Sequence, residues 1–172
     1  MKRALAILAL LALAAQPALA QKTKTAPADA AVAALEVCET FARGDVLAVE
    51  EAVAAGWDAY DQESESPFVR SYAGGRELPG IGWADLFVLV ETYPDRVLGY
   101  CRIDVADTNA KGDRVVEALT GLDRYAGETF KDAHGAYASL SGTGAEDSLL
   151  ITHWDDIGFV IQLTILTPKA GE

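Results

Sequence analysis

Two histidines are the only imidazoles in the chain, and they raise the first question about chemistry. His134 and His153 each fall in a segment that we expect to be a β-strand, and Asp155 and Asp156 closely follow the second. If those strands pair, the imidazoles and a carboxylate meet as a metal site or an acid–base pair. The spacing matches no helical HxxxH or HExxH motif, so two unrelated sheet histidines are the alternative.

A second group of candidate residues surrounds the glycine-rich stretch AGGRELPGIGW at 73–83. Its glycines and proline predict an irregular loop. With Tyr72, Arg76 and Trp83, this loop offers aromatic rings and a guanidinium to a ligand carboxylate or to a protein surface. The stretch matches no phosphate-binding fingerprint, and an ordinary glycine loop is the alternative.

Other reactive arrangements are less complete. The segment SLSG at 139–142 is not the GxSxG elbow of serine hydrolases. The acidic stretch WDAYDQESESP at 57–67 lacks the ordered ligands and central glycine of an EF-hand calcium loop, so it predicts a solvated loop. The sequence therefore predicts no catalytic residue and no cofactor.

The compartment is indicated by the first twenty residues. Lys2 and Arg3 precede an apolar run at 4–15, and the triplet ALA at 18–20 resembles a cleavage site. Because the run is too short to span a bilayer, 1–20 is expected to be a removed signal peptide rather than a membrane anchor. We therefore predict a bacterial protein that is periplasmic or secreted.

Cys38 and Cys101 are the two cysteines of the chain. In an exported protein such a pair favours a disulfide, here between the first helix and a strand. Two separate buried thiols are the alternative. The two cysteines lack the CxxC spacing of a redox-active pair.

The net charge of −12 becomes −14 once 1–20 is removed, because the two basic residues of that segment go with it. Such an acidic chain is a poor match for nucleic acid or an anionic membrane surface. We expect its partner to be a protein, a peptide or a small ligand of unknown identity. Scattered acids that only keep the protein soluble are the alternative.

One domain is expected at 29–168, after a flexible leader at 21–28. Hydrophobic periodicity predicts one helix at 29–41, a second from Asp45 to Gly56 with Val46, Val49 and Val53 inward, and a third that ends near Gly121. The segments expected as strands are 68–72, the two arms of a hairpin at 84–105, 130–140, 148–154 and 157–166.

These elements predict an α+β fold: an antiparallel sheet of about five to six strands, with two N-terminal helices and one middle helix packed on one face. The function expected from this sequence is a non-enzymatic binding or interaction module. The alternative is a small hydrolase or metal-dependent enzyme that uses His134 and His153.

Overall fold

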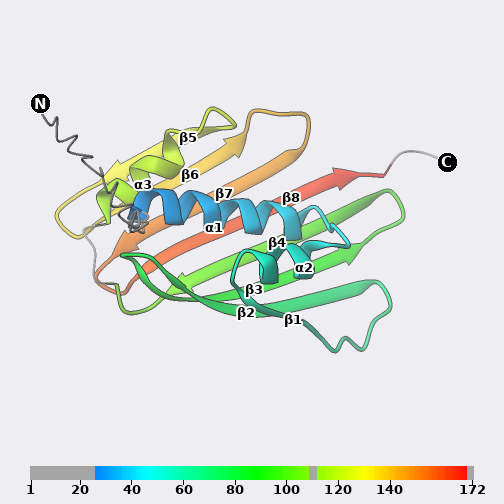
Figure 1. Cartoon of the computed structure of the whole chain (residues 1–172). Coiled ribbons are helices and arrows are strands. Elements are labelled where there is room, and N and C mark those ends of the chain that lie inside the picture. The colour runs from blue at the N-terminus through cyan, green and yellow to red at the C-terminus, as the bar shows by residue number, and fades with distance from the viewer. Residues whose placement is uncertain (1–25, 109–111, 170–172) are drawn as a thin grey trace, which may run out of the picture.

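The computed structural model describes residues 26–108 and 112–169, so the expected signal peptide and most of the leader lie outside the described residues. Within these ranges the chain forms three helices and eight strands (Figure 1). Their bounds are α1 Pro27–Ala42, α2 Ala48–Ala54, β1 Asp58–Gln62, β2 Val69–Leu78, β3 Gly82–Thr92, β4 Arg96–Val105, α3 Asp113–Thr120, β5 Tyr125–Lys131, β6 Gly135–Gly142, β7 Asp147–Asp155 and β8 Phe159–Pro168.

The eight strands form one antiparallel sheet in the order β1-β2-β3-β4-β8-β7-β6-β5. Strands β1 to β4 make one meander and β5 to β8 make another, because each strand pairs with the next along the chain. The meanders join where β4 pairs with β8, from Arg96 opposite Pro168 to Val105 opposite Phe159. The two most central strands therefore come from distant parts of the sequence.

The helices cover one face of this sheet. Helix α1 lies across its middle over β3, β4 and β8, while α2 packs near β1 and α3 near β5 to β7 (Figure 1). Alternate strand residues point toward the helices, and Val88, Cys101 and Leu163 among them are fully buried. The core thus forms between the helices and a single face of the sheet, as hydrophobic burial requires of a two-layer α+β domain.

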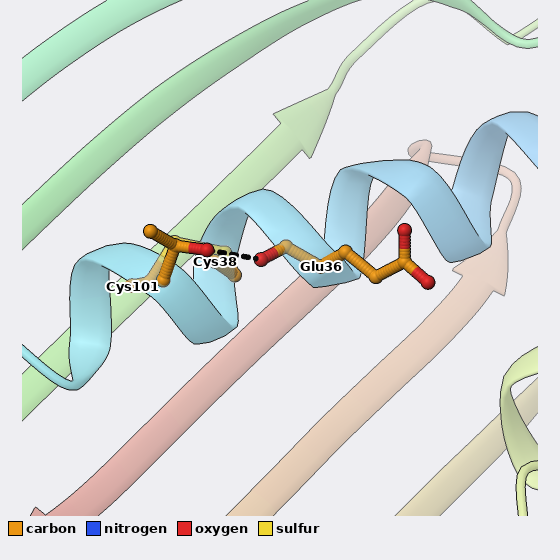
Figure 2. The surroundings of a disulfide bond; sticks show 4 residues. Glu36, Cys38 and Cys101 are labelled. Atoms are coloured by element: carbon orange, nitrogen blue, oxygen red, sulfur yellow. Dashed lines mark hydrogen bonds between the residues drawn. A yellow bond between two sulfur atoms is a disulfide. The ribbon is translucent and has the colours of Figure 1, made fainter. Parts of the chain in front are cut away.

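Cys38 of α1 and Cys101 of β4 form a disulfide in the centre of this core (Figure 2). Both residues are fully buried. The disulfide predicted from the sequence is therefore confirmed. It ties the longest helix to one of the two central strands.

One turn further along α1, the helix approaches β4 so closely that only glycine fits. A Cβ atom added to Gly99 would overlap the carbonyl group of Ala42 at the end of α1. Gly99 pairs with Val90 of β3 on one side and Ile165 of β8 on the other. The glycine therefore fixes how deeply the helix sits on the sheet.

The sheet has eight strands where the sequence predicted five to six. The hairpin at 84–105 is confirmed as β3 and β4, but the expected strand at 130–140 is two strands, with a turn just before Gly135. Strand β1 lies inside the stretch at 57–67 that we expected to be a loop. Both missed strands, β1 and β5, lie at the edges of the sheet and bury one residue each, so they lack the alternating pattern of a half-buried strand.

The expected irregular loop at 73–83 is also wrong, because most of it is regular strand. Strand β2 runs through Gly74 and Gly75, and only 79–81 separate it from β3. A Cβ on Gly75 would lie 2.6 Å from the ring of Trp83, and one on Gly74 would lie 3.1 Å from the backbone of Ala59. These glycines make room for neighbours on adjacent strands rather than a turn.

The second helix is shorter than predicted and buries different residues. It begins at Ala48 rather than at Asp45, and its buried residues are Ala48 and Ala52. Val46 precedes the helix and is 81% exposed, and Val53 is 52% exposed, so only Val49 of the three valines expected inward packs against the core. None of the helices in the described ranges combines the length and the apolar character needed to cross a bilayer.

Reduction of the disulfide under unfolding conditions should lower the thermal midpoint substantially. The bond closes a loop with a sequence separation of 63. The loss of such a cross-link costs about 4 kcal/mol in the chain-entropy model. Calorimetry of the wild type with and without reductant, beside Cys38→Ala and Cys101→Ala, tests this: the two variants should lose equal stability, and an unchanged midpoint would contradict it.

Gly99→Ala should destabilise the fold because its methyl group must displace the end of α1. Overpacking of this kind costs about 1–3 kcal/mol or more. Gly144→Ala is the matched control, since an added Cβ there meets no atom within 4 Å. Urea unfolding should show a loss for the first variant only; equal stabilities would mean that the helix moves away freely.

Candidate binding face

The face of the sheet opposite the helices, which we call the open face, has the exposed aromatic residues of the strands. The helices in the described residues pack on the other face, so alternate strand side chains point into solvent here. Strand register aligns these side chains in rows. One row crosses all eight strands, from β1 to β5, as Tyr60, Ala73, Phe87, Arg102, Gln162, Ile151, Ser139 and Glu128.

The middle of the open face is a hydrogen-bonded polar cluster. Arg102 donates two hydrogen bonds of 2.7 Å to the carboxylate of Asp104. Arg102 and the Tyr100 hydroxyl also donate to the Gln162 carbonyl oxygen, at 3.2 and 3.3 Å. The hydrogen bond to Asp104 raises the pKa of the Arg102 guanidinium, so Arg102 remains charged and paired with Asp104. This cluster crosses the β4–β8 junction, and its side chains form hydrogen bonds with one another.

A shallow groove of roughly 560 Å³ lies beside this cluster, over β5, β6 and β7. Phe130, Tyr137 and His153 stand opposite one another on the three strands. The ring centroids of Phe130 and Tyr137 are 6.4 Å apart, and those of Tyr137 and His153 are 5.8 Å apart and stacked. We call this the aromatic groove; the open-face side chains that line it are those of Glu128, Phe130, Tyr137, Ser139, Ile151 and His153.

Carboxylates surround the aromatic groove. Glu128 is exposed within it, and an Oδ atom of Asp155 lies 3.8 Å from the Nε2 atom of His153. The pKa of Tyr137 is raised, first by partial burial and then by the negative charges of Asp155, Asp132 and Asp156. An apolar aromatic floor therefore lies in a region of negative potential.

Sequence reasoning missed this groove. Glu128 and Phe130 are two residues apart, which places them on one face of an extended segment, and that spacing was the available signal. However, the chain had to turn at residues 132–134 before Tyr137 could lie opposite Phe130. Because we predicted one continuous strand at 130–140, the pairing of Phe130 with Tyr137 across that turn could not be foreseen.

Tyr72, Arg76 and Trp83, the residues expected to bind a ligand, do not meet in one place. Tyr72 is buried under α1, where its ring packs 5.1 Å from that of Phe41. Arg76 lines a hollow between α1 and α2. Trp83 lies on the open face, where its ring covers Gly75. The β pleat separates these residues, because Tyr72 and Arg76 of β2 lie on the helix-covered face of the sheet while Trp83 of β3 lies on the open face.

The two histidines line different hollows. His153 lies in the aromatic groove, whereas His134 is exposed in the turn between β5 and β6 rather than on a strand, and borders a hollow that includes Gly112 and Trp154. Among residues 26–108 and 112–169, no group of three or more His, Cys, Asp or Glu side chains is placed to hold a metal ion.

A partly buried ionic cluster lies on the helix side and links α1 to the start of β5. One carboxylate oxygen of Glu39 accepts hydrogen bonds from Arg124 Nε at 2.7 Å and from the Tyr125 hydroxyl at 2.8 Å. Arg43, at the end of the same helix, pairs with Glu146 at 3.0 Å. Each carboxylate has its own guanidinium, so the charges of this hollow are balanced.

No family model, curated protein or solved structure matches this chain. The candidate site therefore depends on the geometry of the open face alone.

Tyr125→Phe should lower the free energy of unfolding by about 1.5–3 kcal/mol, because it removes a buried hydrogen bond to a charged group. Burial, followed by the hydrogen bond and charge of Glu39, raises the pKa of Tyr125 above its ordinary value of 10.0. The unfolded chain loses this proton first, so wild-type stability should fall as the pH rises above about 10.

Urea unfolding from neutral to alkaline pH measures both effects. Tyr60→Phe is the control, since Tyr60 is exposed on β1. The variant lacking the Tyr125 hydroxyl should show a flatter alkaline decline than wild type or control. Identical curves for all three proteins would show that the Glu39 cluster contributes no net stability.

Proposed function

We propose that this chain is an exported bacterial protein that acts as a non-enzymatic binding or interaction module, with its ligand on the open face of the sheet. The observation that carries the proposal is the aromatic groove. Phe130 is 61% exposed there, beside Tyr137 and His153, although the solvated face of an antiparallel sheet is normally polar. Clusters of exposed apolar and aromatic side chains mark interaction sites in monomeric proteins.

Export is supported by the sequence of residues 1–20, which has the three parts of a secretory signal peptide. The disulfide between Cys38 and Cys101 is consistent with an oxidising compartment such as the periplasm or the exterior. The net charge of −12 makes nucleic acid a poor ligand for the open face.

The alternative is a small hydrolase or metal-dependent enzyme that uses His134 and His153. Its support is the 3.8 Å distance between His153 and Asp155, which would orient an imidazole as a base. Because His134 borders a different hollow, the reaction would depend on His153 without its expected partner. A binding role does not require a second catalytic residue beside His153, and for that reason we favour binding over catalysis.

Site-specific photo-crosslinking in the native host tests the proposal. A photoreactive phenylalanine analogue placed at Phe130 probes the aromatic groove. The same analogue at Phe68 is the matched control, since Phe68 is 64% exposed but precedes β2, outside the groove. Adducts should form from position 130 and not from position 68, and mass spectrometry of the adduct gives the class of ligand.

Two outcomes would contradict a binding role for the open face. Equal adducts from both positions would mean non-specific contact. Absence of adducts from position 130, with the protein present at its normal level and with its disulfide formed, would mean that nothing occupies the groove in the cell.

A further inference from the structure

We propose that the aromatic groove binds a segment of a partner protein that carries a lysine or arginine side chain next to an apolar one. This inference rests on the proposed binding function and names the chemistry of its ligand. It follows from three features of the groove: its aromatic floor, its carboxylate rim and its apolar continuation along β7.

The aromatic floor provides ring surfaces for a cation. Tyr137 stacks on His153 and lies 6.4 Å from Phe130, so the three side chains form a continuous ladder across β5, β6 and β7. Lysine and arginine side chains are attracted to aromatic faces, and arginine also stacks on them. The groove therefore offers more to a cation than simple apolar contact.

The carboxylate rim makes a cation the favoured occupant. Glu128 lies within the groove, and the charges of Asp132, Asp155 and Asp156 act on Tyr137. The basic residue next to Phe130 does not neutralise them, because Lys131 points to the other face of the sheet and binds Asp113 at 2.7 Å.

Arg102 does not neutralise them either. It stands two strands away from Ile151 in the same row of the open face, and its guanidinium donates to Asp104 through Nε and Nη2 and to Gln162 through Nη1. Asp132 and Asp155 accept backbone hydrogen bonds in their own turns, whereas Glu128 is exposed and remains available to a ligand from outside. A second copy of this chain is a poor occupant, since it would bring the same carboxylates and a net charge of −12.

The apolar continuation extends the site beyond one cation. Ile151 lines the groove, and Leu149 is two residues away on the same face of β7 and 41% exposed. A free amine or a lone lysine side chain on the aromatic ladder would leave these residues uncovered. A peptide segment with an apolar residue beside its cation covers both parts, and the groove's roughly 560 Å³ accommodates several side chains.

Fluorescence anisotropy with a defined probe tests this inference on the mature, disulfide-bonded protein. The probe is a short fluorescein-labelled peptide that alternates lysine with leucine. We expect it to bind more tightly than a peptide alternating lysine with serine, and a peptide alternating glutamate with leucine should not bind. Binding should weaken as salt is raised, because exposed charges are screened.

Two variants place the binding in the groove. Phe130→Ala should weaken the affinity for the lysine–leucine peptide about tenfold, and Glu128→Gln about threefold. Both side chains are exposed, so their replacement should leave the fold intact. The matched controls, Phe68→Ala and Glu63→Gln, remove similarly exposed groups outside the groove and should leave the affinity unchanged.

Three results would overturn the inference. Equal weakening by the groove variants and their controls would mean that the peptide binds to general negative charge. Equal binding of the lysine–serine peptide would mean a cation site without apolar recognition. If none of the peptides binds although position 130 yields adducts in cells, the binding function stands and the chemistry assigned to its ligand is wrong.

Discussion

The packing of α1 on β4 is the contact on which the rest of this structure depends. Ala42 and Gly99 touch backbone to backbone, and the disulfide joins Cys38 to Cys101 beside them. Since β4 pairs with β3 on one side and β8 on the other, one helix is fixed to both meanders of the sheet. A helix held this closely excludes water from the central strands, and the other two helices complete the layer on the same face.

This one-sided packing produces a sheet with two different faces. The side toward the helices contains the core, with Leu35, Val88 and Leu163 fully buried. The other side is stabilised by cross-strand pairs, among them the polar cluster around Arg102 at the β4–β8 junction. That cluster satisfies its own hydrogen bonds, so the open face is ordered without a second layer.

The two halves of the open face differ in how their polar side chains are paired. On the β1–β4 half, Trp83 is tied to Asp85 by a 3.1 Å hydrogen bond, and Arg102 is tied to Asp104. On the other half, Phe130 is 61% exposed and Glu128 is exposed beside it. A groove whose aromatic rings and carboxylates are left to solvent is better suited to recognition than to stability.

The sequence by itself determined the strongly periodic elements, which are the hairpin at 84–105 and the first helix, and the pairing of Cys38 with Cys101. Those features follow from local apolar spacing and cysteine number, which do not depend on what lies next to each element. Tertiary structure decided the edge strands of the sheet. Strands β1 and β5 bury one residue each, and they are extended because they pair with β2 and β6. Tertiary structure also decided the site, because the faces and neighbours of Trp83, Phe130 and His153 are set by strand register across distant segments, a long-range property that local spacing does not encode.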